Sequence, residues 1–210
     1  MDKFPLARQG WPYLAGAAFL AAVASALHLW WLAVPLWLVT LLICNFFRDP
    51  ARGSSAGPGA IISPADGKVV VVAEASHPQF PGERVRMVSI FMNIFDVHVN
   101  RAPMAGRVLK VVHRPGGFVP ADRAEAATAN ERVDMVLAGR QATIVVTQVA
   151  GLVARKIECW ASPGVAMQTG QRYGMIRFGS RLDLYMPLSV KVQVTPGQRV
   201  KAGESVIAEV

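Results

Sequence analysis

The hydrophobic positions of the chain fall into two regions with different patterns. Residues 9 to 47 form an apolar stretch of 39 residues without Asp, Glu, Lys or Arg, and His28 is its one titratable interruption. As a single helix this stretch would be about 58 Å long, nearly twice a hydrocarbon core of about 30 Å. We therefore expect two helical passes of about 19 residues each, with a turn beside Trp30 and Trp31, since aromatic side chains favour the membrane interface.

The charges on either side of this stretch predict its orientation. Lys3 and Arg8 precede it, and Arg48 and Arg52 follow it. Because cationic residues are retained on the cytoplasmic side, we expect both ends in the cytoplasm and the hairpin in the cell (inner) membrane. A hairpin that enters one leaflet without crossing is an alternative. A secretory signal is another, but the stretch is too long and lacks a convincing small-residue cleavage site before a mature domain.

Residues 48 to 60 are rich in Pro, Gly and Ser and predict a linker, after which the pattern changes to short β-branched runs. Turn residues separate the runs, and this spacing is typical of an all-β sandwich or barrel. A helix is expected only around residues 121 to 129. The runs that predict strands are 68–72, 84–92, 107–113, 132–138, 142–149, 154–160, 172–178, 181–186 and 190–194.

The C-terminal residues 194 to 210 contain two Gly-bearing turns between short β segments. They resemble the barrel-sandwich hybrid of lipoyl and biotinyl carrier domains. The lysine that carriers present between two methionines has no equivalent here, so the fold resemblance does not imply a carrier function. The expected fold class is mainly β, barrel-sandwich-hybrid-like, with an N-terminal transmembrane helical hairpin.

The composition narrows the range of partners. The chain has 22 Lys and Arg against 14 Asp and Glu, a net charge of +8. Without a dense basic run or a stacking-aromatic pattern, we expect no nucleic acid and favour an anionic membrane surface as the partner. Cys44 and Cys159 lie in different regions and are not expected to pair. The sequence contains no tight cluster of His, Cys and carboxylate residues, so we expect no metal site.

The Gly179-Ser180 bond, between two predicted strands, has the residues that a self-cleaving backbone requires. Glycine allows a strained geometry and leaves its carbonyl open to attack. The serine hydroxyl can attack that carbonyl and shift the acyl group from nitrogen to oxygen. β-Elimination of the ester would leave dehydroalanine, which hydrolyses to ammonia and a pyruvoyl group. Most Gly-Ser pairs are ordinary turns, so the surrounding motifs must decide.

Five motifs provide that context, in the order FFRDPAR (46–52), ISPADGKV (62–69), FDVHVNRAP (95–103), NERV (130–133) and FGS (178–180). Together they resemble the phosphatidylserine decarboxylase family, most closely the short bacterial form of the proenzyme. The resemblance implies pyruvoyl-dependent decarboxylation of phosphatidylserine to phosphatidylethanolamine after autocatalytic cleavage at Gly179-Ser180. It also implies a large subunit (1–179) and a small subunit (180–210) that stay associated. A homo-oligomer is compatible with the sequence.

The resemblance assigns three catalytic residues. Ser180 would become the covalent pyruvoyl cofactor. Its Schiff base with the substrate amine would be an electron sink for the carbanion left when carbon dioxide departs. Asp66 corresponds to the acid of the family's self-cleavage triad, and His98 is the candidate base. The residues alone favour a turn aspartate and a structural strand histidine, so both roles are what the resemblance implies. Asn130, Glu131 and Arg132 form the NER motif, which we expect to shape a pocket or position the substrate, with a strand-initiating turn and a solvated ion pair as the alternative.

One position departs from the family pattern. Longer members have two histidines, spaced H-x-x-H, before the proline of this segment, whereas this chain has His98 and then Arg101 before Pro103. Either His98 serves both self-cleavage and the later proton transfer, or another group shares the work.

The sequence therefore predicts three parts: a tail and membrane hairpin (1–47), a linker (48–60) and a β-rich catalytic domain (61–210). The competing interpretation is a non-catalytic barrel-sandwich membrane adaptor or carrier-like module, in which Gly179-Ser180 is only a turn. A metallopeptidase-like hybrid barrel would need metal ligands that the sequence does not supply.

Overall fold

The chain divides into two compact units, Met1–Ala51 and Arg52–Val210. The structure is a computed structural model that describes residues 5–53, 56–57, 59–121, 123, 125–152, 156–177 and 180–210. The two units are described separately below.

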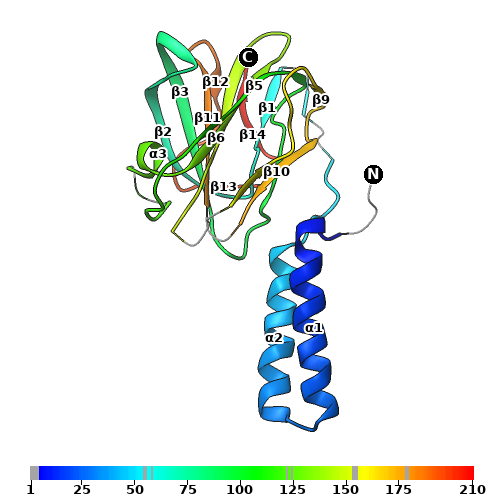
Figure 1. Cartoon of the computed structure of the whole chain (residues 1–210). Helices are drawn as coiled ribbons and strands as arrows, with labels where there is room; N and C mark the ends of the chain where they lie inside the picture. The colour runs from blue at the N-terminus through cyan, green and yellow to red at the C-terminus, as the bar shows by residue number, and fades with distance from the viewer. Residues whose placement is uncertain are drawn as a thin grey trace. The chain divides into compact units, whose positions relative to one another are not determined.

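The first unit is a pair of antiparallel helices, α1 (Trp11–Ala26) and α2 (Trp30–Phe46), preceded by the short 3-10 helix η1 (Arg8–Gly10) (Figure 1). The turn between the helices includes His28, which has a left-handed backbone with φ of 57°. The two helices contain 16 and 17 residues. Among the described residues, no helix combines the length and the apolar character needed to cross a membrane.

Small side chains form the contact between α1 and α2, while large apolar side chains face outward. Ala21, Ala24 and Ala33 are buried, which allows the two backbones to approach closely. The indole Nε1 of Trp37 donates a hydrogen bond to Ser25 Oγ (3.3 Å) on the facing helix. Outward-facing side chains include Phe19, Leu20, Trp30, Trp31, Leu38, Leu41 and Leu42. This arrangement is the reverse of a water-soluble helix pair.

The second unit is mainly β, which confirms that part of the prediction. Its one described helix is α3 (Ala126–Ala129), shorter than the expected helix over 121–129. Its described strands are β1 (Ala60–Ile62), β2 (Gly67–His77), β3 (Phe80–Met92), β4 (Val99–Arg101), β5 (Gly106–Arg114), β6 (Arg132–Ala138), β7 (Thr143–Val149), β8 (Ile157–Cys159), β9 (Ala166–Met167), β10 (Arg172–Ile176), β11 (Ser180–Pro187), β12 (Lys191–Val192), β13 (Arg199–Val200) and β14 (Val206–Glu209).

The described strands form three sheets. The largest is a curled sheet of eight strands in the order β13-β2-β3-β11-β7-β6-β5-β9 (Figure 1). Two sheets of three strands accompany it, in the orders β1-β14-β12 and β4-β10-β8. The strand pairs of all three sheets are antiparallel. The hybrid-barrel resemblance of the C-terminal residues stays a prediction.

Strand β11 lies at the centre of the large sheet and is buried on both faces. It pairs with β3 along its whole length, from Ser180 opposite Met92 to Pro187 opposite Val85. Its other edge pairs with β7. Because side chains alternate along a strand, Leu182, Leu184 and Met186 enter the main hydrophobic core, while the intervening side chains face the other side.

We expect the packing around β11 to dominate the stability of this unit. Replacing the fully buried Leu184 by alanine removes core contacts and leaves a cavity, which costs about 2–5 kcal/mol. In a protein of this size each kcal/mol lowers the melting temperature by roughly 2–4 °C. The measurement is thermal unfolding of Leu184→Ala beside Leu109→Ala, whose leucine in β5 is exposed. Equal melting temperatures for the two variants would contradict this view of the core.

Candidate active site

Ser180 is the first residue of β11 and is fully buried. Its hydroxyl Oγ lies 4.0 Å from the sulfur of Met92, the residue opposite it on β3. Gly179, the other half of the predicted cleavage bond, lies outside the described residues, as does Phe178. The structure therefore places the predicted nucleophile in the centre of the sheet, at the end of a strand that is paired on both sides.

Buried Asn100 and Gln148 are connected to Ser180 through the sulfur of Met92. The Met92 sulfur also accepts a long contact from Asn100 Nδ2 (3.8 Å), and Asn100 Oδ1 accepts a hydrogen bond from Gln148 Nε2 (2.8 Å). Gly174 is required beside this amide, because a Cβ there would lie 2.8 Å from Gln148 Nε2 and 2.4 Å from the Glu158 carbonyl oxygen. These contacts hold in place the side chains that pack beneath Ser180.

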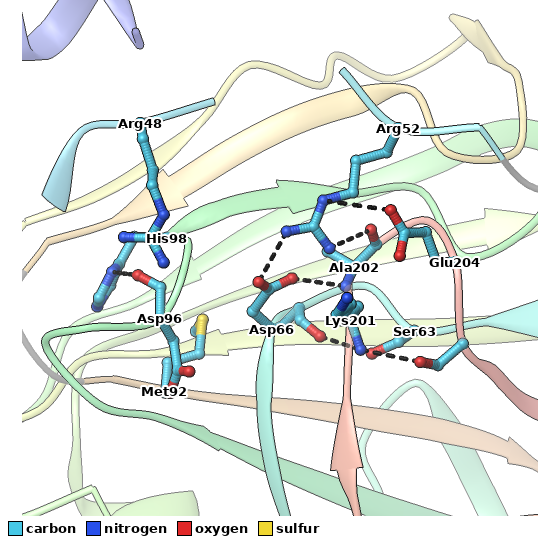
Figure 2. Close-up of polar contacts among 12 residues, drawn as sticks. Arg48, Arg52, Ser63, Asp66, Met92, Asp96, His98, Lys201, Ala202 and Glu204 are labelled. Atoms are coloured by element: carbon cyan, nitrogen blue, oxygen red, sulfur yellow. Dashed lines mark hydrogen bonds and ion pairs between the residues drawn. The ribbon is translucent and has the colours of Figure 1, made fainter. Parts of the chain in front are cut away.

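His98 is fully buried in the segment that joins β3 to β4. Its Nδ1 lies 2.9 Å from the backbone carbonyl oxygen of Asp96 (Figure 2). Because a carbonyl oxygen can only accept a hydrogen bond, Nδ1 carries a proton, so Nε2 is the nitrogen that accepts or releases a proton when the ring acts as an acid or base. The structure thus holds His98 in a tautomer that suits a general base. His98 lies on the same connection as Met92, the residue paired with Ser180.

Asp66 immediately precedes β2 and is buried between two donors (Figure 2). Its Oδ2 accepts a hydrogen bond from Arg52 Nη2 (2.8 Å), and its Oδ1 accepts one from the backbone N–H of Ala202 (2.7 Å). Arg52 also donates to the Ala202 carbonyl oxygen (3.2 Å). The following Gly67 has φ of 149°, and a Cβ there would lie 2.1 Å from the Phe91 carbonyl oxygen. The Asp-Gly pair thus places a carboxylate against the C-terminal segment.

Arg101, the residue that departs from the expected H-x-x-H pattern, lies near the same C-terminal turn as Asp66. It is buried, and its Nη1 donates to the Gly170 carbonyl oxygen (3.1 Å). Its Cδ approaches the backbone of Gly203 so closely that a Cβ at that residue would be 3.0 Å away. Arg101 therefore packs against Gly203. The residue before it, Ala202, is the one whose N–H binds Asp66. Arg101 and Asp66 are far apart in sequence but converge on one turn.

Among the described contacts, those of His98 and Asp66 join each of them to other residues and not to one another. A histidine and carboxylate pair does lie on the face of the large sheet opposite Ser180. His77 Nε2 is 3.7 Å from Asp134 Oδ1, and the His77 ring packs on Tyr185 with ring centroids 4.4 Å apart. Burial acts to raise the pKa of Asp134, but hydrogen bonds from His77, Arg114 and Thr147 outweigh it and lower that pKa. All of these groups have partners within the cluster, which is typical of a structural polar network.

Asn130 of the NER segment (130–132) has a structural role in this fold. Asn130 is fully buried, and its side chain bonds the backbone of Val119 in both directions (2.8 Å each) and the Ala150 carbonyl oxygen (2.7 Å). It thereby joins the segment before α3 to the end of β7. Within the described part of the chain, no group of three or more His, Cys, Asp or Glu side chains could hold a metal ion.

Several site residues were missed by sequence reasoning. Arg52, Asn100 and Arg101 each lie inside a quoted motif but received no role, and only Arg101 was noted as a departure. Met92 and Gln148 had no sequence signal, because a buried Met or Gln resembles any other strand residue. The donor at Ala202 is a backbone N–H, which leaves no trace in the side-chain pattern.

Comparison with known proteins gives one consistent result. The sequence profile of the phosphatidylserine decarboxylase family matches residues 39–208. A phosphatidylserine decarboxylase proenzyme from Cupriavidus pinatubonensis is 45% identical over 206 residues, covering 97% of this chain and 94% of the relative. Proenzymes of the same description from Desulfotalea psychrophila (44%; 99% and 98% covered) and Nitrosomonas europaea (42%; 97% and 94% covered) are also similar. The chain therefore belongs to the phosphatidylserine decarboxylase family.

Proposed function

We propose that this chain cleaves itself between Gly179 and Ser180 and that the processed protein decarboxylates phosphatidylserine to phosphatidylethanolamine. The observation that carries the proposal is the position of Ser180. Its hydroxyl is buried at the start of the central strand β11, and its strand partner Met92 begins the connection that holds His98. Membership of the family supplies the substrate and the reaction class.

The cleavage reaction balances without an outside oxidant or reductant. The Ser180 oxygen attacks the Gly179 carbonyl carbon, the C–N bond breaks, and the chain becomes an ester with a free amine on residue 180. Loss of the residue 180 α-proton and of the Gly179 carboxylate then leaves dehydroalanine. Tautomerisation and attack by one water release ammonia and leave a pyruvoyl group. We assign His98, whose Nδ1 is engaged by the Asp96 carbonyl and whose Nε2 is left for proton transfer, to the proton transfers of this sequence.

The surroundings of Ser180 fit a pyruvoyl group. The described contact of its hydroxyl is a long one to a thioether, so removal of that hydroxyl costs little. A pyruvoyl group at residue 180 would supply a ketone for the substrate amine and an electron sink for the electron pair that stays on the substrate carbon when carbon dioxide leaves. Because the second histidine position holds Arg101, we propose that His98 also returns the proton to the substrate carbon.

We propose that Asp66 supports the same proton transfers as a fixed negative charge. Arg52 and the Ala202 N–H hold its carboxylate in one orientation, which is the arrangement expected of a charge-stabilising acid rather than of a solvated turn residue. Residues 180 to 210 supply Ala202, so the acid from the large fragment is oriented by the small fragment.

The two fragments would remain one folded unit after cleavage. Within residues 180 to 210, β11 pairs with β3 and β7, β13 pairs with β2, and β14 pairs with β1. The small fragment thus contributes strands to two sheets, and its buried Arg181 donates to Asp183 Oδ1 (2.6 Å) and Ser89 Oγ (2.9 Å). Cutting one peptide bond removes none of these contacts.

We further propose that the α1–α2 pair anchors the protein in the cell (inner) membrane, with the β-rich unit facing the cytoplasm. The support is the reversed packing of the pair, with alanines inside and large apolar side chains outside. The polar groups that remain bond within the pair, since Thr40 Oγ donates to the Leu36 carbonyl (2.8 Å) and Ser25 Oγ to the Ala21 carbonyl (2.8 Å).

Ser180→Ala should remain one full-length chain, because no hydroxyl is left to attack the Gly179 carbonyl. The matched control is Ser162→Ala, which removes an exposed serine of the same unit and should be processed like the wild-type protein. Denaturing gel electrophoresis of freshly expressed protein reports the outcome. Normal splitting of Ser180→Ala would refute the proposed cleavage.

Asp66→Asn should slow processing, roughly 10²–10⁴-fold if the carboxylate supports acid–base catalysis. Asparagine can still accept from the Ala202 N–H but no longer offers a charge to Arg52. The control is Glu204→Gln, because exposed Glu204 also approaches Arg52, with Oε1 3.8 Å from Nε. A time course of chain splitting, with melting temperatures to confirm folding, gives the comparison. Equal processing rates in the two variants would remove Asp66 from the mechanism.

A further inference from the structure

The turn that follows β3 carries two exposed apolar side chains at its tip. Ile94 is 53% exposed and Phe95 is 61% exposed, in a position where turns usually carry Gly, Asn, Asp or Ser. Backbone N–H groups of the turn fix its shape: Asn93 donates to Asp96 Oδ2 (2.9 Å), and Phe95 donates to Asn93 Oδ1 (2.8 Å). The turn is thus closed at its base and holds its apolar side chains outward.

This turn lies at the end of the large sheet where Ser180 begins. Met92, directly before the turn, is opposite Ser180 in the β3–β11 register. Asp96, at the base of the turn, accepts the hydrogen bond from His98. At the same end of the sheet, exposed Leu152 follows β7, whose last residue Val149 is opposite Arg181. Apolar loop residues therefore border the proposed catalytic residues.

Positive charge crosses the same end of the sheet. Arg181, one residue after Ser180, belongs to a row of paired residues that crosses the sheet from β13 to β5. Five residues of this row are cationic: Arg199, Lys68, Arg181, Arg132 and Arg114. Arg181 and Arg114 are neutralised by Asp183 and Asp134. Lys68 on β2 is exposed. Arg199, on the neighbouring edge strand β13, forms an ion pair with Asp96 Oδ1 (3.1 Å), and its side chain remains 68% exposed.

We propose that this end of the sheet docks onto an anionic phospholipid bilayer. Ile94 and Phe95 enter the acyl region, and Lys68 and Arg199 contact lipid phosphates beside them. The inference rests on the proposed function, because a bilayer lipid is the substrate. Docking of the turn would bring the end of the sheet that carries His98 and Ser180 to the headgroup region. A substrate lipid could then reach these residues without leaving the bilayer completely.

The direct test is a fluorescent probe on the turn. Phe95→Cys, in a Cys44→Ser and Cys159→Ala background, is labelled with NBD and reconstituted as the full chain into vesicles. The control is Leu188→Cys, an exposed leucine just beyond the far end of β11, about 25 Å along the strand from Ser180. We expect spin-labelled lipid to quench the probe at residue 95 and not at residue 188.

Lipid charge is the second variable of this experiment. Quenching at residue 95 should be stronger in phosphatidylglycerol–phosphatidylcholine vesicles than in phosphatidylcholine alone, because Lys68 and Arg199 favour anionic lipid. Equal quenching at both sites, no quenching at residue 95, or no dependence on phosphatidylglycerol would each overturn the proposal. A signal that follows protein concentration instead of lipid would assign the turn to a contact between copies of the chain and also overturn it.

Activity supplies a readout that separates this inference from the proposed function. Ile94→Ser/Phe95→Ser should process normally and should decarboxylate dispersed dihexanoyl-phosphatidylserine like the wild-type protein. On vesicle-borne phosphatidylserine we expect kcat/KM to fall about tenfold or more, given the apolar area removed from the bilayer. Leu188→Ser should be unaffected on both substrates. Equal loss of activity on both substrates in Ile94→Ser/Phe95→Ser would overturn the docking inference. A wild-type protein that is inactive on both substrates would count against the proposed function. The probe experiment would then decide the docking inference by itself.

Discussion

The pairing of β11 between β3 and β7 is the constraint on which the rest of the site depends. The backbone ladder with β3 places Ser180, because the one contact of its side chain among the described residues is a long one to the Met92 sulfur. Conversion to a pyruvoyl group removes the hydroxyl and the peptide nitrogen of residue 180, so its position afterwards depends on the paired strand that follows it. The seven residues after it remain paired with β3, so the register survives the cut that the proposed chemistry makes.

The C-terminal segment connects this strand to the rest of the site. Asp66 and Arg52 both bond the backbone of Ala202, and Arg101 packs beside Gly203, so three side chains from the first part of the unit meet one turn of the last part. The buried Arg181 bonds Asp183 on its own strand and Ser89 on β3, which links the small fragment to the strand beside it. Processing would therefore convert a continuous chain into two pieces that still build one site.

The sequence predicts the strands well and the site only in part. Runs such as 132–138 coincide with β6, because alternation and β-branched residues act locally. The short strands β4 and β9 carry too few residues for a period. Motifs pointed to Ser180, His98 and Asp66, but the donors to Asp66 depend on tertiary contacts across 14 and 136 positions. A backbone N–H such as that of Ala202 has no side-chain signature, so no pattern could reveal it.

The account rests on the conversion of Ser180, and intact-mass spectrometry of the denatured wild-type protein tests that most directly. The account predicts two species, residues 1–179 and residues 180–210, with the smaller one lighter by one ammonia than a fragment that begins with serine. A fragment with an unmodified serine at its start would show simple hydrolysis instead of serinolysis. A single chain of full mass from native membranes would contradict self-processing and leave Gly179-Ser180 as an ordinary connection between strands.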